Sequence, residues 1–352
     1  SALASNTTAS NNTAVGYQAA YSNTTGSVTA VGFEAGKANT TGSASVALGI
    51  QALSSNTTGN SNNAIGNATM YANTTGSSNT ALGHLAMRFN TTASNNTAVG
   101  YQAGYSNTTG EIHAFGMNAG YFNTTGTNNT AIAGGALYSN TTGSYNVAVG
   151  DQALVSNTTA SNNTAVGYQA GLANTTGANN TSIGYQSLLD NTTGFSLTSV
   201  GWGSLANNTT GYENVAVGVS ALRDNTTGLN NIAVGGSALL SNTTASNNTA
   251  VGYQAGYSNS TGTELTFFGY KAGANTTGSY NTYVGSQTGI TNTSGTGNTA
   301  IGWGAISSSS GATDNTAVGY GAGSSITTGS KNTIIGRYNG NQGGLDIRTS
   351  SN

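Results

Sequence analysis

The sequence predicts an all-β protein, a parallel β-solenoid of about 20 stacked 17-residue rungs. A glycine marks a 17-residue period, an apolar residue precedes that glycine in every copy, and an Asn-Thr-Thr motif follows seven positions later in most copies. A unit with one short strand cannot bury an apolar face alone, so neighbouring copies must stack. Disorder is disfavoured because Pro is absent and only 5% of the residues are charged.

The period begins at Gly16 and ends at Gly336, with Ala133 replacing the glycine once. Three steps are shorter than the others by a single residue, two of them just after an Asn-Thr-Thr-Gly motif and one just before Asn275. Deletions confined to such places are typical of loops. We therefore expect a solenoid array over residues 1–336 and a transition segment over 337–352 that leads to a missing C-terminal region.

A short strand is expected around the residue before each glycine, because β-branched residues recur there with period-2 spacing. We expect these side chains to stack as the core ladder. The predicted ladder consists of Val15, Val31, Leu48, Ile65, Leu82, Val99, Phe115, Ile132, Val149, Val166, Ile183, Val200, Val217, Val234, Val251, Phe268, Val284, Ile301, Val318 and Ile335.

The Asn-Thr-Thr motif predicts the return turn, because Asn and Gly readily adopt positive φ. Its asparagines have two interpretations: a hydrogen-bonded ladder, which we favour, or acceptors of N-linked sugar in Asn-x-Ser/Thr sequons. They are Asn6, Asn23, Asn39, Asn56, Asn73, Asn90, Asn107, Asn123, Asn140, Asn157, Asn174, Asn191, Asn208, Asn225, Asn242, Asn259, Asn275 and Asn292. A second column, four positions before the glycine, is also expected to be a ladder; it includes Asn12, Asn96, Asn163 and Asn248.

Each rung offers little apolar area against the entropic cost of ordering its backbone. We therefore expect further burial against neighbouring chains. Aromatic residues directly after the glycine favour such an interface, and stacking on glycans is the alternative. This column consists of Tyr17, Phe33, Tyr101, Tyr168, Tyr185, Trp202, Tyr253, Tyr270, Trp303 and Tyr320, and Leu53, Met70, Met87, Leu137 and Leu154 are expected to add apolar surface.

The motifs NTAVG, NVAVG (146–150) and SVALG (45–49) resemble the head repeat of trimeric autotransporter adhesins. NNTAVGYQAGYSNTTG (95–110) also resembles shaft repeats of phage-type tail-fibre proteins, and residues 332–352 resemble the join to their C-terminal intramolecular chaperone. The resemblance covers almost the whole chain and implies a left-handed β-roll in a homotrimeric rod. The repeat unit of this chain is longer than is usual in the family, which leaves the rung geometry open.

Catalytic chemistry is not expected, because converging titratable groups are scarce. There is no Cys, and the nine acidic residues and two histidines, His84 and His113, are spread along the chain. We predict no catalytic, cofactor or metal site and no enzymatic activity. Seven Lys and Arg residues are too few for a nucleic-acid surface, and no apolar run is long enough to span a membrane.

The sequence thus favours an extracellular structural or adhesive fibre shaft on a cell or virion surface. Its expected partners are copies of itself, in a homotrimer and in end-to-end fibrils, and surface glycans are a further candidate. The chain starts at Ser1 in mid-motif, so we expect a piece of a longer protein. The alternative function is ice binding by a threonine-rich solenoid, although the paired threonines of Asn-Thr-Thr would face opposite ways in a strand.

Overall fold

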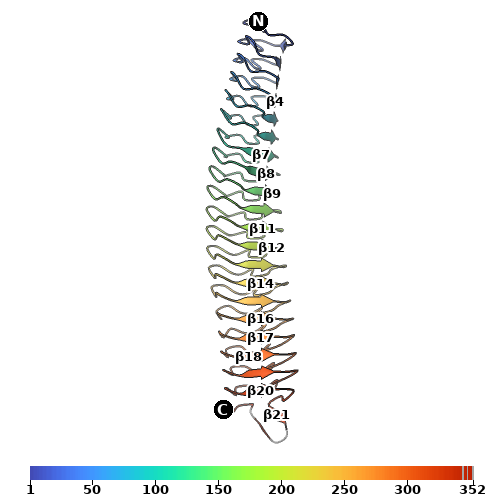
Figure 1. Ribbon diagram of the computed structural model, residues 1–352, viewed down its shortest axis with the longest axis vertical. Coiled ribbons are helices and arrows are strands. Elements are labelled where there is room, and N and C mark those ends of the chain that lie inside the picture. The colour runs from blue at the N-terminus through green and yellow to red at the C-terminus, as the bar shows by residue number, and fades with distance from the viewer. Residues whose placement is uncertain (343–344, 347, 351–352) are drawn as a thin grey trace. The chain divides into compact units, whose positions relative to one another are not determined.

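The computed structural model describes residues 1–342, 345–346 and 348–350. Within these ranges the chain forms no helix, and a short strand recurs once in each repeat as a rung of a parallel β-solenoid (Figure 1). The predicted all-β parallel β-solenoid with rungs of about 17 residues is confirmed. The chain divides into two compact units, residues 1–178 with β1 to β10 and residues 179–352 with β11 to β22.

The strands of the first unit are β1 (Thr13–Val15), β2 (Val28–Val31), β3 (Ser45–Leu48), β4 (Asn63–Ile65), β5 (Thr80–Leu82), β6 (Thr97–Val99), β7 (Ile112–Phe115), β8 (Asn129–Ile132), β9 (Val147–Val149) and β10 (Thr164–Val166). Those of the second unit are β11 (Thr181–Ile183), β12 (Thr198–Val200), β13 (Val215–Val217), β14 (Ile232–Val234), β15 (Thr249–Val251), β16 (Thr266–Phe268), β17 (Thr282–Val284), β18 (Thr299–Ile301), β19 (Thr316–Val318), β20 (Thr333–Ile335), β21 (Asn341–Gln342) and β22 (Leu345–Asp346).

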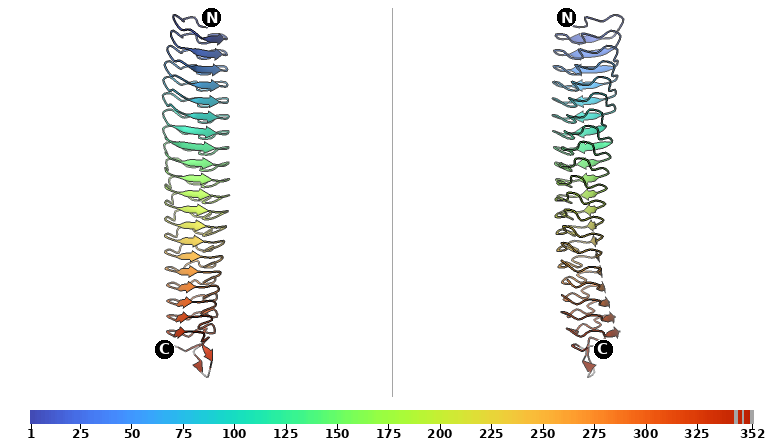
Figure 2. Two further views of the ribbon diagram at one scale, coloured as in Figure 1. Left: turned by 45° about the vertical axis from the view of Figure 1, so that its right-hand side comes forward. Right: turned by 90° about the vertical axis from the view of Figure 1, so that its left-hand side faces the viewer.

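Neighbouring rungs pair in parallel and in register. In the first unit Ala98 of β6 pairs with Ala114 of β7, and in the second Ala216 of β13 pairs with Ala233 of β14. Figure 2 shows the strands of each unit stacked along one side, with the turns returning on the other. Equivalent residues therefore form columns, and each copy of the motif is the template for the next.

The core ladder predicted from the sequence is wrong, because the residue before each glycine points outward. Strand side chains alternate between the two faces, and the middle residue of each triplet is the one that points inward. Val15 is 59% exposed and Ile335 is 80% exposed. None of the ladder is buried: Val15, Val31, Leu48, Ile65, Leu82, Val99, Phe115, Ile132, Val149, Val166, Ile183, Val200, Val217, Val234, Val251, Phe268, Val284, Ile301, Val318 and Ile335 are all exposed or partly exposed.

The interior column lies one residue earlier and is made mostly of alanine, because the coil is too slim for larger side chains at most rungs. The backbone after the strand turns tightly: Gly100 has φ +135°, and a Cβ there would lie 2.6 Å from the carbonyl oxygen of Gly116. The interior column is Ala14, Ala30, Ala47, Ala64, Ala81, Ala98, Ala114, Ala131, Ala148 and Ala165, then Ser182, Ser199, Ala216, Ala233, Ala250, Phe267, Tyr283, Ala300, Ala317 and Ile334.

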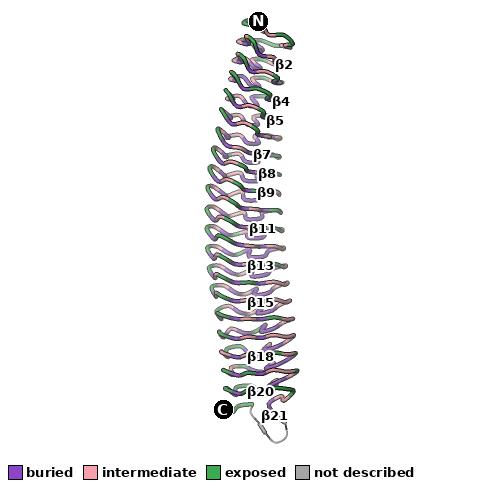
Figure 3. Tube along the Cα trace, in the orientation of Figure 1, coloured by how far each residue is buried: buried purple, intermediate pink, exposed green. Residues whose placement is uncertain are grey.

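The rest of the core comes from residues three and four positions after the glycine. Alanine usually stands at the first position, and Leu, Met or Gly at the second. Buried segments recur along the coil from rung to rung (Figure 3). Five side chains that we expected on the surface are buried instead: Leu53, Met70, Met87, Leu137 and Leu154. They supply the bulk that the alanine column lacks.

Glycine replaces leucine where another large side chain points inward. A Cβ on Gly120 would lie 2.1 Å from Cδ1 of Ile112, and one on Gly273 would lie 2.6 Å from Cζ of Phe267. Phe267 in turn stacks on Tyr283, with ring centroids 5.3 Å apart. The interior volume is thus kept filled by exchanging bulk between neighbouring positions.

The segment expected to be a transition is partly described. β21 and β22 pair antiparallel, and the amides of Gly329 and Ser330 donate to the carbonyl oxygens of Arg348 and Ser350. Residues 343–344, 347 and 351–352 of this segment lie outside the described residues.

Candidate functional site: the outer face of the sheet

The outer face of the sheet carries two columns of side chains. Because strand residues alternate, the residues three and one before each glycine share this face. The residues directly before each glycine form the apolar column, which is the set that the sequence wrongly predicted to be the core ladder. The first set, the threonine column, consists of Thr13, Thr29, Val46, Asn63, Thr80, Thr97, His113, Thr130, Val147 and Thr164 in the first unit and Thr181, Thr198, Val215, Ile232, Thr249, Thr266, Thr282, Thr299, Thr316 and Thr333 in the second.

The apolar column presents one β-branched, leucine or phenylalanine side chain at every rung. Consecutive rungs lie about 4.8 Å apart, so these side chains form an unbroken strip within each unit. Neither column contains Lys, Arg, Asp or Glu. A monomeric soluble protein seldom exposes a contiguous apolar strip of this kind.

The aromatic column borders the outer face and is also exposed. Several of its members stack on the next rung's member: the ring centroids of Tyr17 and Phe33 are 5.4 Å apart, and those of Trp303 and Tyr320 are 4.9 Å apart. Trp303 remains 49% exposed despite its partner. The column therefore widens the apolar area beside the strip.

The Asn-Thr-Thr asparagines form the predicted ladder. Nδ2 of Asn56 donates to Oδ1 of Asn39 at 2.9 Å and to the carbonyl oxygen of Gly59 at 3.0 Å. N-linked sugar would attach to this same Nδ2, which is buried and already donates twice. The buried members are Asn23, Asn39, Asn56, Asn73, Asn90, Asn107, Asn123, Asn140, Asn157, Asn174, Asn191, Asn208, Asn225, Asn242, Asn259 and Asn292.

Two of the predicted asparagines lie outside this ladder. Asn6 is exposed, and its Nδ2 donates to the carbonyl oxygen of Ala9. Asn275 is also exposed, because the residue lost before it shifts the register by one, and Thr276 takes the buried place. The assignment of Asn6 and Asn275 to the buried ladder is therefore wrong.

The second asparagine column is a ladder as well. Nδ2 of Asn96 donates to Oδ1 of Asn79 at 3.1 Å, and its own Oδ1 accepts from the amide of Ile112 at 2.6 Å. The hydrogen-bonded ladder stops at Ile112, because this residue has no side-chain amide. Leu265 stops the ladder after Asn248 for the same reason. Val28 and Leu197 follow Asn12 and Asn180 in the same way, so four rungs carry a buried apolar residue in place of the ladder amide.

Four of the charged residues form two separate surface ion pairs. Nζ of Lys37 lies 2.7 Å from Oε1 of Glu34, whose Oε2 accepts from Gln51 at 3.0 Å. The hydrogen bond from Lys37 lowers the pKa of Glu34, and the same contact raises the pKa of Lys37. No third titratable group joins them in the hydrogen-bonded contact, so the pair does not resemble an acid–base site.

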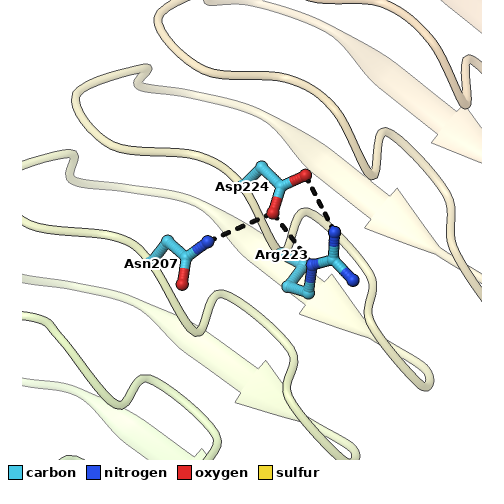
Figure 4. Close-up of polar contacts among 3 residues, drawn as sticks. All are labelled: Asn207, Arg223 and Asp224. Carbon is cyan, nitrogen blue, oxygen red and sulfur yellow. Dashed lines mark hydrogen bonds and ion pairs between the residues drawn. The ribbon is translucent and has the colours of Figure 1, made fainter.

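A second pair lies on the other unit. Arg223 and Asp224 form a bidentate contact, with Nε to Oδ1 at 2.8 Å, and Asn207 donates to the same Oδ1 at 3.1 Å (Figure 4). The hydrogen bonds to Asp224 raise the pKa of Arg223. This contact ties two neighbouring rungs together at the surface.

The two histidines are not brought together by the fold. His84 lies against the ring of Tyr101, with centroids 5.6 Å apart, and His113 takes an exposed place in the threonine column. Among the described residues there is no cluster of three His, Asp or Glu side chains able to hold a metal ion. A search of the same residues finds no helix with the length and apolarity to cross a membrane.

The outer face could not have been located from the strand pattern alone. The signal that sequence reasoning missed is size: the middle position is nearly always Ala or Ser, whereas the positions on either side vary in bulk. No protein-family model matches the chain, and neither does any curated protein. The outer face with its bordering aromatic column is therefore the feature from which function is argued.

Proposed function

We propose that the chain is an extracellular structural and adhesive fibre shaft in which three copies pack side by side through the outer face of the sheet. The observation that carries the proposal is the apolar column, one exposed apolar side chain per rung on a face without charge. Burial of such a strip against other copies removes apolar area from water at about 25 cal/mol per Å².

Another copy of the chain is the partner that best matches this face. Its columns have the same rung spacing, so side chains from two copies can interdigitate along the whole contact. The face bears no charges that would repel an identical face, and threonine hydroxyls beside the strip can hydrogen-bond across the contact. The left hand of the coil and the number of three chains are proposed from the resemblance to adhesin head repeats.

The position of the fibre outside the cell, on a cell or virion surface, is part of the same proposal. It is supported by the resemblance and by a surface rich in amide and hydroxyl groups with only 5% charged residues. End-to-end association of the rods into fibrils is part of the same proposal. Aromatic side chains that stay outside the contact would be available to stack on glycans.

The native mass of the particle tests the assembly. We expect three chains, and we expect the combined substitutions Val217→Asp, Val234→Asp and Val251→Asp to give single chains that keep their β circular dichroism. Three carboxylates buried per copy would each need desolvation without a partner. A wild-type mass of one chain would contradict the proposal.

The matched control places the same charges on the same three rungs, away from the outer face. Thr227→Asp, Thr244→Asp and Thr261→Asp lie in exposed turns. We expect this variant to keep the wild-type mass. If it dissociated equally, the effect would come from added charge in general and not from the outer face.

Ice binding is the second candidate, and one observation favours it. From β15 to β20 the threonine column is unbroken, with Thr249, Thr266, Thr282, Thr299, Thr316 and Thr333 beside the apolar column on one sheet face. These are strand residues, unlike the Asn-Thr-Thr threonines in the turns. Thermal hysteresis in the wild type that is lost in Thr282→Lys would favour ice binding. If the wild type showed no thermal hysteresis, ice binding would be excluded.

A further inference from the structure

The outer face of the second unit has two borders that differ in charge. The aromatic border follows each strand and consists of the aromatic column and the residue after it. The leading border precedes each strand and is the position two residues before the threonine column. The charged residues of the leading border are Glu213, Glu264, Asp314 and Lys331, and those of the aromatic border are Lys271 and Arg337. Acids therefore prevail on one border, and the other carries cations alone.

The first match between the two borders lies in the rung of β16. Glu264 precedes this strand and is exposed, and Lys271 follows it and is partly exposed. Nζ of Lys271 lies 5.3 Å from the ring centroid of Tyr270, so the cation stands at the height of this rung. No ion pair joins Glu264 to Lys271, or either of them to another described residue. Both charges are therefore available to groups outside the chain.

The second match lies in the rung of β19. Arg337 belongs to the following rung, but its guanidinium lies 4.9 Å from the ring centroid of Tyr320, which follows β19. Asp314 precedes the same strand. Its carboxylate lies toward Gly297 of the preceding rung, where a Cβ would meet Oδ1 at 2.5 Å, and no ion pair joins it to Lys331. Each cation thus lies on a tyrosine of a rung whose other border carries an acid.

A ring of parallel copies brings the two borders together. In such a ring the contact between neighbours is heterologous, so the end of a strand in one copy lies beside the start of the equivalent strand in the next. Equivalent rungs stand at one height, because rotation about an axis parallel to the stack leaves height unchanged. The aromatic border of one copy therefore meets the leading border of its neighbour, rung for rung.

We propose that copies of this chain pack in parallel and at equal height, with Lys271 of each copy paired to Glu264 of the next and Arg337 paired to Asp314. The proposal rests on the assembly through the outer face and supplies its orientation and register. The apolar column alone would fit after a shift by any whole rung, since its rungs are alike. Charges at two rungs remove that freedom, because a shifted copy would leave them unpaired.

Glu213 is an acid of the leading border without a match. It precedes β13 and is exposed, and the aromatic border of the same rung carries Val219 and Ser220. No cation would face this carboxylate in a ring of parallel copies. Glu213 is therefore the matched control for Glu264.

Charge reversal tests the first pair, with light scattering over a dilution series as the measurement. Glu264→Lys and Lys271→Glu should each raise the dissociation constant of the assembly by at least about tenfold, because every contact in the ring changes from attraction to repulsion. The combined exchange should restore the wild-type value, and Glu213→Lys should leave it unchanged. The fold should persist, because Lys331 and Glu34 hold these residue types at the same two places of other rungs, with φ of 62° and 56°.

A zero-length carbodiimide cross-link gives a second, independent measurement. This reagent joins a carboxylate to an amine in direct contact, forming an amide with loss of water. We expect wild type to give a Glu264–Lys271 linkage, identified by mass spectrometry, and species of two and three chains on a denaturing gel. Glu264→Gln should lose this linkage.

The outcomes distinguish failure of the pairing from failure of the assembly. A wild-type native mass of one chain would contradict the assembly itself. A native assembly in which the exchange variant binds no more tightly than either reversal, or in which no Glu264–Lys271 linkage forms, would overturn the pairing and leave the assembly standing. Recovery by the exchange together with the linkage would support the pairing.

Discussion

At the scale of single residues, buried amides take the role that large apolar side chains have in wider folds. Each ladder asparagine closes its own turn through the carbonyl oxygen three positions on, and most also bond to the preceding rung; Asn140 does both, through Gly143 and Asn123. Amide stacking of this kind is directional, so it fixes the register of neighbouring rungs more strictly than alanine contacts can.

We expect Asn140→Ala to lower the free energy of unfolding by about 2–3 kcal/mol, because three hydrogen bonds are lost, and Oδ1 of Asn123 and Nδ2 of Asn157 each lose a buried partner. Native-state hydrogen exchange of the neighbouring rungs would measure the loss. The control is Asn275→Ala, which removes the same residue from the same motif at an exposed place. An equal effect at both positions would contradict the ladder's role.

Tyr283 gives the chain a specific sensitivity to alkali. Burial raises the pKa of Tyr283 far above its ordinary value of 10, although the hydrogen bond from Asn292 opposes the shift. The folded state keeps this proton while the unfolded chain loses it, so stability is full below pH 10 and falls as pH rises above it. The decline is about 1.4 kcal/mol per pH unit. The free energy of unfolding, measured with urea between pH 9 and 11, should fall less steeply with pH in Tyr283→Phe than in wild type.

At the scale of the strand, three residues suffice because many backbone amides of a rung, inside and outside the strand, donate to carbonyl oxygens of the neighbouring rung, as Gly116 does to Val99. The alternation of inward and outward side chains was predictable from the sequence. Which residues of the strand point inward was not. Both the alanine and the valine of Thr-Ala-Val are apolar, and the width of the coil is set by turns with positive φ at residues such as Gln102 and Leu137, which local pattern does not reveal.

Exchanging the two residues tests directly which of them points inward. In Ala98→Val/Val99→Ala the larger side chain would point inward between Ala81 and Ala114, so we expect a loss of about 1–3 kcal/mol by overpacking. The thermal midpoint of single chains would report the loss. Val99→Ala alone should change that midpoint little. If Val99→Ala lowered the midpoint strongly and the double exchange did not, Val99 would belong to the core, as the sequence predicted.

At the scale of the whole molecule, periodicity was the most informative property of the sequence. The constant spacing of the repeats and the low charge predicted parallel stacking, the turns and the asparagine ladders correctly. The outer face was not predictable, because its position depends on which side of the backbone each strand side chain leaves.

In-register pairing also has a consequence for how such a chain can change in length. Removing or inserting one full period leaves every remaining pair of rungs with its original partners, so unequal recombination between repeated coding segments yields foldable products. Loss of a single residue is different, because each of the three short steps coincides with a changed ladder residue: Val28, Ile112 and Thr276. Length can therefore change by whole coils with every ladder intact, whereas the fractional steps of this chain each interrupt a ladder.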